Sequence, residues 1–369
     1  MRVGIVAWAG SDNLGDEILL HSLISCVRAV REDTSFVVFT PDPDRVAELH
    51  PVDAEPMPTL RARGAAARQG AVQRAIRGCD ILFFGPGTVF QERSPNLPWP
   101  GTLVLFARIL GMARLGGTPV AAVGVGVREG GTPFGRQLLR LIGSASVAVG
   151  TRDRRSASYF GRAAQVIGDM AYALPLPDLG AAEPDQRFAL SVRPLAAGTE
   201  DRLVTSVSQC ADRLLHDGWS AAFLPMAFGR GARGEDDRSL YERDFRDRME
   251  LLANPLDGHA PLAGALDEWL RTLATHRLVL ATRLHAAVIA VALAIPTVAI
   301  GYERKVIDAF ADLGLDRFVV PPEVGSETLH RTAIMAAGAP AAFRAASARI
   351  ASQGKVAQQF VASVLGRVG

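Results

Sequence analysis

The sequence predicts an α/β protein with two domains, each built on a parallel sheet. Short aliphatic segments alternate with segments of helical periodicity along most of the chain, a pattern typical of strand–helix–strand units. A segment rich in proline, glycine and acidic residues, 174–185, interrupts the alternation, and the pattern restarts after it. With 369 residues, of which 49% are hydrophobic, the chain is long enough for about two domains. We therefore expect domains at residues 1–178 and 186–338, and a C-terminal helix, 339–369, that packs back on the first domain.

The aliphatic segments of the first domain are its expected strands. They lie at residues 2–7, 35–39, 81–84, 120–123, 147–149 and 165–167. Helical patterns fall between them, at residues 16–30, 66–77, 103–115, 134–142 and 154–160. Because strands and helices alternate, the strands should pair in parallel and carry helices on both faces, as in Rossmann-like domains.

The second half repeats this pattern. Its expected strands lie at residues 188–192, 221–224, 278–281, 297–300 and 318–320. The charged, glycine-interrupted region 228–256 is typical of a mobile loop or lid, although its later part fits a packed helix equally well. Residues 341–365 form a long alanine-rich helical pattern that can run back across the first domain.

Composition excludes several classes of protein. The net charge of +2 is too small to argue for binding to nucleic acid or to an anionic membrane. The three cysteines are dispersed and lack Cys-x-x-Cys spacing, so we expect neither a disulfide framework nor a metal site, and a cytoplasmic location. The first residues do not form a signal peptide, and no uncharged apolar stretch reaches the ~20 residues of a spanning helix, so we expect no stable membrane insertion.

The strongest functional signal is the segment from Thr282 to His285. It stands between two apolar blocks, 277–281 and 286–295, which have the lengths of a buried strand and a fully buried helix, with Thr282 as the expected N-cap. An arginine, Arg283, and a histidine therefore lie where a strand becomes a helix, the place where open α/β sheets bind anionic ligands. The alternative is an arginine paired with a nearby acid and a histidine satisfied in the core.

Lysine usage gives a second signal. Only two of the 40 basic residues counted as Lys+Arg are lysines, Lys305 and Lys355. Lys305 follows another expected strand. Lysine offers a compact charge and a pKa that can shift, whereas arginine offers a fixed planar fork, so a lysine kept at this position suggests that arginine could not replace it. A chance survivor of a codon bias toward arginine is the other explanation.

Other polar residues also follow expected strands. Asn13, Asp16 and Glu17 lie in a loop that opens a helix, where the helix dipole alone would favour the two acids. Gly87 and Thr88 follow the strand 81–84, and Gly87 permits a close backbone approach to a ligand or simply a tight turn. Arg152 and Arg193 also follow strands, at sites where each could instead form a surface ion pair. Several such cations at strand ends predict a ligand cleft.

The order of these motifs resembles the polysaccharide pyruvyl transferase family over most of the chain. The resemblance rests on the segments 13–17, 85–88, 124–126, 152–156, 168–169, 191–193, 224–226, 283–285 and 302–305. It implies a fold like that of B-type glycosyltransferases and phosphoenolpyruvate as the donor. It also implies that Arg152, Arg193, Arg283, His285 and Lys305 match donor-binding or catalytic positions. Pro86 in the second loop, and Arg128 and Glu129 near the third, depart from the family pattern and leave the acceptor open.

The chemistry expected of such a site needs cations and one acid/base. Arginine recognises the carboxylate and phosphate of phosphoenolpyruvate, and a histidine can move the proton. The predicted catalytic residues are His285, Lys305 and Arg283. The predicted donor-binding residues are Arg152, Arg193, Arg283, Leu284 and Lys305. The predicted acceptor-binding residues are Asn13, Asp16, Glu17, Gly87 and Thr88. No cofactor besides this co-substrate is expected.

The acceptor and the assembly state stay open at this stage. A sugar, a nucleotide sugar or a glycosylated metabolite would fit as acceptor, the product could be a ketal or an enolpyruvyl ether, and a homo-oligomer is compatible with the chain. Two other classes compete with the pyruvyl transferase interpretation. A nucleotide-sugar-dependent glycosyltransferase would use the same fold but release a nucleoside diphosphate, and a noncatalytic sugar or nucleotide binder would turn over no donor.

Overall fold

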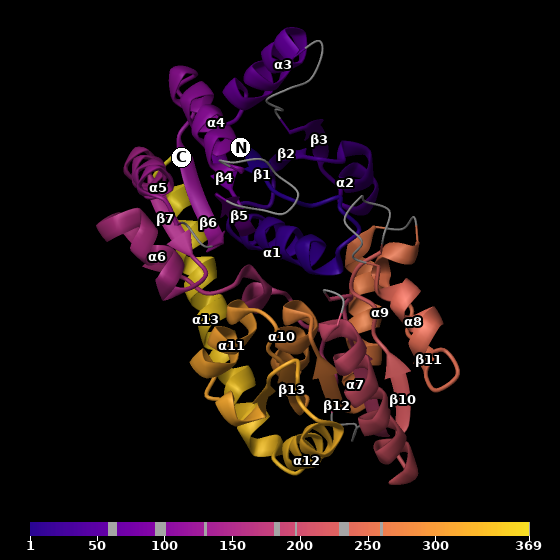
Figure 1. Cartoon of the computed structure of the whole chain (residues 1–369). Coiled ribbons are helices and arrows are strands. Elements are labelled where there is room, and N and C mark those ends of the chain that lie inside the picture. Colours follow the sequence, from indigo (N-terminus) through magenta and orange to yellow (C-terminus); the bar gives the residue numbers. More distant parts are fainter. Residues whose placement is uncertain are drawn as a thin grey trace. The chain divides into compact units, whose positions relative to one another are not determined.

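A computed structural model describes all residues except 58–64, 93–100, 129–130, 181–184, 196–197, 229–235, 259–260 and 369. It confirms the predicted class, because strands and helices alternate and the strands form two sheets in which every pairing is parallel (Figure 1). Among the described helices, none combines the length and the apolarity needed to span a bilayer.

The first sheet has the strand order β3-β2-β1-β4-β6-β7-β8, with β5 paired to β6. Its strands are β1 (Arg2–Val6), β2 (Ser35–Thr40), β3 (Asp53–Pro56), β4 (Ile81–Phe84), β5 (Gly87–Gln91), β6 (Val120–Arg128), β7 (Ala148–Thr151) and β8 (Ala164–Val166). The helices between them are α1 (Leu14–Val30), α2 (Pro43–Leu49), α3 (Ala65–Arg77), α4 (Leu103–Leu115), α5 (Pro133–Ala145) and α6 (Arg154–Phe160). All four residues of β4 are buried, because helices cover both faces of the sheet centre.

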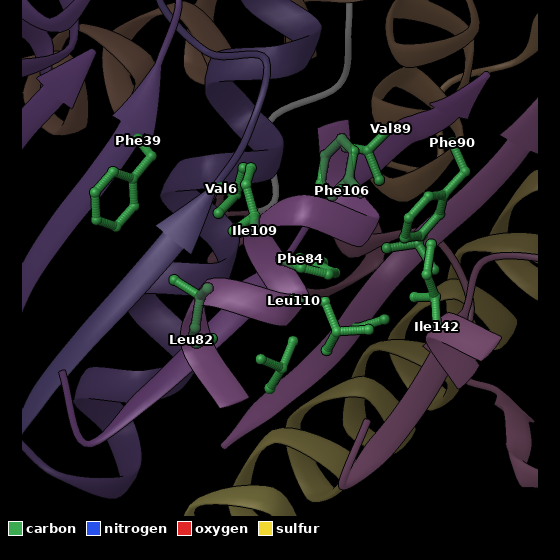
Figure 2. Close-up of a cluster of buried hydrophobic side chains, with 14 of the residues drawn as sticks. Val6, Phe39, Leu82, Phe84, Val89, Phe90, Phe106, Ile109, Leu110 and Ile142 are labelled. Atoms are coloured by element: carbon green, nitrogen blue, oxygen red, sulfur yellow. The ribbon is translucent and has the colours of Figure 1, made fainter. Parts of the chain in front are cut away.

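Aromatic and aliphatic side chains pack together on one face of the first sheet (Figure 2). Leu82 and Phe84 are two residues apart on β4, so both point to the same face and meet α4. The ring centroids of Phe84 and Phe106 lie 5.0 Å apart at 86°, an edge-to-face geometry that stabilises aromatic pairs. This packing fixes the strand ends from which the polar loops of the first sheet emerge.

The second sheet has the strand order β11-β10-β9-β12-β13-β14. Its strands are β9 (Asp185–Ser191), β10 (Ser220–Phe223), β11 (Glu250–Leu251), β12 (His276–Ala281), β13 (Thr297–Ile300) and β14 (Val319–Val320). Its helices are α7 (Thr199–His216), α8 (Asp237–Asp244), α9 (Leu262–Ala274), α10 (Leu284–Ala292), α11 (Arg304–Asp312) and α12 (Ser326–Ala337). As the apolar block predicts, α10 is buried at every position except His285.

The chain forms two compact units that follow the two sheets. The first contains residues 1–11, 16–175 and 353–369, and the second contains residues 12–15 and 176–352. The last helix, α13 (Pro340–Gly366), therefore contributes to both units. Its second part packs in the first unit, where a Cβ on Gly354 would lie 2.2 Å from the backbone oxygen of Tyr172.

Several short elements were not expected from the sequence. The strands β3, β5 and β11 and the helix α2 are short and lie next to loops, so their patterns are weak. The expected N-cap Thr282 was wrong, because Arg283 occupies the N-cap position of α10. The Thr282 hydroxyl instead accepts the Arg193 N–H at 2.9 Å, which ties the end of β12 to the loop after β9.

A buried polar cluster lies inside the first unit. Glu17 is fully buried, with Oε1 accepting the Gly10 N–H at 2.6 Å and Oε2 lying 2.9 Å from Nε2 of His50. The ring of His21 lies 6.5 Å from that of His50. Burial lowers the pKa of His21 to about 4, and the charges of His50 and Arg28 act in the same direction.

This low pKa predicts a loss of stability in mild acid. The unfolded chain binds a proton at His21 near pH 6.5, whereas the folded chain keeps the ring neutral down to about pH 4. The free energy of unfolding should therefore fall as the pH drops through this window, by about 2 kcal/mol between pH 7.5 and pH 5. Urea unfolding should show a smaller fall for His21→Gln than for the unmodified chain. His330→Gln, at a more exposed histidine, is the control and should show the same fall in the free energy of unfolding as the unmodified chain. If the fall in His21→Gln were also unchanged, His21 would not be the group responsible for it.

Candidate active site

Three neighbouring strands of the second sheet are followed by polar residues, and Arg193 after the first of them contacts residues after the other two. Because β9, β12 and β13 are parallel neighbours, their carboxyl ends lie at one edge of the sheet. Arg193 follows β9, and its Nη1 donates to the hydroxyl of Tyr302, which follows β13, at 2.8 Å. Its guanidinium carbon also lies 5.1 Å from the centroid of the Tyr302 ring. The structure thus brings together the segments that carry Arg193, His285 and Lys305, as the strand-end pattern predicts.

Arg283 is held by a buried carboxylate. The residue is 6% exposed, with Nε donating to Oδ2 of Asp237 at 3.2 Å and Nη2 donating to Oδ1 at 2.5 Å. Oδ2 of Asp237 also accepts the N–H groups of Met226 and Ala227, at 2.9 and 3.1 Å. Burial raises the pKa of Asp237, and the Arg283 guanidinium and the two backbone N–H groups partly oppose this shift. Arg283 therefore anchors the segment after β10 to the start of α10.

His285 lies against the glycine of the N-terminal polar loop. A Cβ on Gly15 would lie 2.1 Å from Nδ1 of His285, so only glycine fits at this position without moving the ring. Asn13 shapes the same loop, since its Oδ1 accepts the Gly15 N–H at 3.0 Å. Two segments about 270 residues apart in sequence therefore lie in direct contact within the second unit.

The loop is held in place by the segment that Asp237 anchors. The Leu14 N–H donates to the carbonyl of Met226 at 2.8 Å, and the Phe228 N–H donates to the carbonyl of Asp12 at 3.0 Å. Asn13 and Ala227 form an antiparallel bridge between these two bonds. The contacts close a ring that runs from α10 through Arg283 and Asp237 to residues 226–228, then through residues 12–15 and back to His285.

Lys305 and Leu284 complete the second-unit set. Nζ of Lys305, in the first turn of α11, lies 2.7 Å from Oε2 of Glu303, and the two side chains are 32% and 25% exposed. Leu284 is the first residue of α10 and its side chain is buried. Since the first amides of a helix have no partner within the helix, this end of α10 favours an anion.

The remaining predicted site residues lie mainly in the first unit. Nη1 of Arg152 donates to the hydroxyl of Thr88 at 3.3 Å, and Nε lies 3.3 Å from Oδ2 of Asp153. Arg152 also lies over Gly126, where a Cβ would be 2.8 Å from its Nη2. Arg152, which was predicted to bind the donor, therefore contacts Thr88, which was predicted to bind the acceptor. Gly87, at φ +97°, begins the same strand as Thr88.

The two acids of the N-terminal loop differ in their surroundings. Asp16 is partly exposed in the first turn of α1, where the helix dipole stabilises it. Glu17 is fully buried, with both oxygens engaged by Gly10 and His50. These contacts indicate that Glu17 holds the loop in place. Its predicted binding of an acceptor stays a prediction.

Two residues of the site were not selected from the sequence. Asp237 lies in the region 228–256, which the sequence predicts as a lid or a packed helix, and part of that region, 229–235, is outside the described residues. The only local signal for Asp237 is its place in the first turn of a polar helix, which most exposed acids share. Tyr302 stands in a motif but carried no predicted role. Among the described residues, no group of three or more His, Cys, Asp or Glu side chains could hold a metal ion.

Comparisons with known proteins indicate a family and a fold. The sequence profile of a family described as polysaccharide pyruvyl transferase matches residues 13–304, a region that ends one residue before Lys305. A comparison with curated proteins found no match.

Solved structures share the fold. The chain is similar to HepE of Anabaena, solved in complex with UDP, with a TM-score of 0.62 and 14% identity over 100% of both chains. It is also similar to a glycosyltransferase from Rickettsia africae, with a TM-score of 0.61 and 10% identity over 100% of this chain and 98% of that one. A UDP-GlcNAc 2-epimerase from Neisseria meningitidis gives 0.59 and 9% over 99% and 100%. These likenesses confirm the expected fold of B-type glycosyltransferases.

Proposed function

The chain belongs to the polysaccharide pyruvyl transferase family, and we propose that it moves the pyruvyl group of phosphoenolpyruvate onto hydroxyls of a sugar or glycosylated acceptor, with release of phosphate. The observation that supports this most is that Arg193, His285 and Lys305 follow three neighbouring parallel strands, whose carboxyl ends lie at one edge of one sheet. A doubly anionic donor needs more than one cation, and an addition to its double bond needs a proton donor.

In this proposal Arg193 and the amide end of α10 bind the carboxylate and phosphate of the donor. Tyr302 orients the Arg193 guanidinium through the hydrogen bond at 2.8 Å. Lys305 stabilises charge on the leaving phosphate, because its ammonium group is accessible and compact. Arg283 acts mainly as a positioning residue, since the carboxylate of Asp237 holds it in a bidentate pair.

The reaction proceeds in two stages. His285 delivers a proton to the methylene carbon of phosphoenolpyruvate, and an acceptor hydroxyl adds to the resulting cationic carbon and gives up its own proton. A second hydroxyl then attacks the same carbon as the C–O bond to phosphate breaks, and its proton passes to the departing phosphate, which leaves a ketal and inorganic phosphate. No cofactor is required, because the donor already carries the leaving group. General acid–base assistance of this kind typically contributes ~100- to 10,000-fold.

We assign binding of the acceptor to predicted site residues other than Arg193, Lys305 and the start of α10. Asn13 and Asp16 orient acceptor hydroxyls near Gly15, and Gly87 with Thr88 forms a second contact region together with Arg152. This assignment differs from the sequence-based one in adding Arg152, which we group with Thr88 because the two side chains are hydrogen-bonded, and in leaving out Glu17, whose two oxygens are engaged by Gly10 and His50.

A donor screen tests the proposed activity. The chain is incubated with phosphoenolpyruvate and candidate sugars, nucleotide sugars and glycosylated metabolites, and released phosphate is measured beside the mass of the acceptor. We expect phosphate release that depends on the acceptor, together with a mass gain of one pyruvate unit less water. Proton NMR then separates a ketal, which has a methyl signal, from an enolpyruvyl ether, which has vinylidene signals.

The same screen separates the competing functions. A glycosyltransferase would leave phosphoenolpyruvate unchanged and release UDP or another nucleoside diphosphate from a nucleotide sugar. A noncatalytic binder would bind a ligand and release neither product. Either result would reject the proposed reaction.

The contact between Gly15 and His285 gives a further test. In Gly15→Ala the added methyl group would lie 2.1 Å from Nδ1, so the ring must move. We expect kcat to fall about 100-fold, the cost of misplacing a catalytic group by about 1 Å. Gly264→Ala, on α9 of the same unit, is the matched control, because a Cβ there meets no atom within 4 Å. Unchanged turnover in Gly15→Ala would show that the position of this ring does not matter.

A further inference from the structure

Positive charge is concentrated in one part of the chain. Residues 57–168 contain 15 arginines and 4 acidic residues, a net charge of +11, whereas the whole chain carries +2. All other residues together are therefore acidic. A charge asymmetry of this size is typical of a chain that binds a polyanionic partner through one region.

Helices α4, α5 and α6 of the first unit carry six of these 15 arginines. They pack side by side, α4 against α5 and α5 against α6 (Figure 1). Their exposed arginines include Arg108, Arg136, Arg140 and Arg154. None of these four forms an ion pair with a carboxylate of the described residues.

Many surface arginines of the second unit have an acidic partner. About half of them lie within ion-pair distance of an acid, as in the pairs Arg187–Glu250, Arg238–Asp257, Arg243–Glu200, Arg246–Glu242, Arg248–Asp212 and Arg271–Asp267. On α4, α5 and α6, by contrast, exposed arginines without a carboxylate partner in the described part of the chain lie on three adjacent helices that contain no acidic residue. Their charge is available to a partner outside the chain.

Exposed apolar side chains lie on the same helix as two of these arginines. Phe134 and Leu141 are 46% and 56% exposed and stand two turns apart on one side of α5. Arg136 and Arg140 stand one turn apart on the other side of the exposed face. The helix contains no acidic residue. An exposed face with apolar and arginine strips is typical of helices that lie at a bilayer interface.

A surface hollow adjoins the arginine strip. It is lined by Arg136 and Arg140 of α5 and by Ser158 and Tyr159 of α6. Two guanidinium groups with a hydroxyl and a phenol beside them match a phosphodiester, since guanidinium forks bind phosphate oxygens bidentately. We call the six residues Phe134, Arg136, Arg140, Leu141, Ser158 and Tyr159 the α5–α6 surface.

We propose that the α5–α6 surface docks the protein on an anionic phospholipid bilayer, with a lipid phosphate in the hollow and Phe134 and Leu141 among the acyl chains. Nucleic acid would also satisfy the arginines, but it offers no partner for the aliphatic side chain of Leu141. A membrane explains both strips of the helix. The inference is independent of the proposed reaction, because none of these residues belongs to the candidate active site.

Vesicle sedimentation tests the docking. The full chain should bind vesicles of phosphatidylglycerol and phosphatidylcholine but not vesicles of phosphatidylcholine alone, and added salt should weaken the binding. The double variant Arg136→Glu/Arg140→Glu should bind at least about 30-fold more weakly, because each arginine near an anionic leaflet contributes about fivefold. Phe134→Ser/Leu141→Ser should remove the part of the binding that survives high salt.

A matched variant controls for net charge. Arg331→Glu/Arg344→Glu changes the charge by the same amount at exposed positions of α12 and α13 and should bind vesicles like the unmodified chain. Equal losses in the two charge-reversed variants would overturn the proposal, as would binding to a duplex oligonucleotide through Arg136 and Arg140 without binding to vesicles. Full competition by soluble glycerol phosphate would reduce the hollow to a site for small phosphates and would also overturn it.

Discussion

Replacement of His285 by alanine is expected to lower the rate of phosphate release from phosphoenolpyruvate by about 100- to 10,000-fold. The imidazole is the one titratable ring in the first turn of α10, and it is partly exposed and lies against Gly15. Without it, no neighbouring group on that turn can deliver a proton to the methylene carbon. The fold should persist, because His285 is the one residue of α10 that is not buried.

Steady-state kinetics with thermal unfolding checks this result. His285→Gln keeps the size and polarity of the ring without titrating near neutral pH, and should lose as much activity as His285→Ala. His330→Ala, at a histidine on α12 paired with Asp217, is the control and should keep full activity. Near-normal turnover in either His285 variant would remove the histidine from the mechanism.

Asp237→Asn is expected to destabilise the protein by about 3–5 kcal/mol, the usual cost of leaving a buried charge without its partner. Asp237 is fully buried and Arg283 is 6% exposed, so solvent cannot replace the lost carboxylate charge. The asparagine oxygen can still accept the Met226 and Ala227 N–H groups, so the loss reports mainly on the ion pair.

A double-mutant cycle measured by urea unfolding isolates that pair. In an Arg283→Met background the Asp237→Asn change should cost much less, because no buried cation remains. Asp308→Asn, which breaks an exposed pair with Arg304 on α11, should cost less than about 1 kcal/mol. Equal costs with and without Arg283 would show that the pair contributes nothing specific.

The pair should also matter for activity. Asp237 and Arg283 hold residues 226–228, which in turn hold the loop that contacts His285. We therefore expect the folded fraction of Asp237→Asn to show a lower kcat than the unmodified chain. This effect would identify Asp237 as a positioning residue that acts through the loop.

Much of the fold could be predicted because it depends on local patterns. Segments such as 278–281 and 286–295 have the composition and length of a buried strand and a buried helix, and they become β12 and α10. Parallel pairing follows from the alternation of such segments. The placement of Arg193, His285 and Lys305 at one edge follows in turn, because the carboxyl ends of neighbouring parallel strands lie together.

The parts that could not be predicted depend on long-range contacts. Nothing in the residues around Asp237 shows that Arg283, 46 positions later, will pair with it. The sequence around Glu17 predicts a polar loop at the start of a helix. In the folded chain Glu17 is instead buried against His50, 33 positions away. The net charge of +2 concealed the basic region 57–168, because a sum over the chain cancels charges that lie on different surfaces.

Binding of phosphoenolpyruvate, measured by isothermal titration calorimetry beside UDP, addresses the donor site most directly. If the cations after β9 and β13 form that site, phosphoenolpyruvate binds saturably to the unmodified chain, Arg193→Gln and Lys305→Gln weaken it, and UDP does not compete. Saturable binding of UDP with no binding of phosphoenolpyruvate would contradict the assignment of this site to a pyruvyl donor.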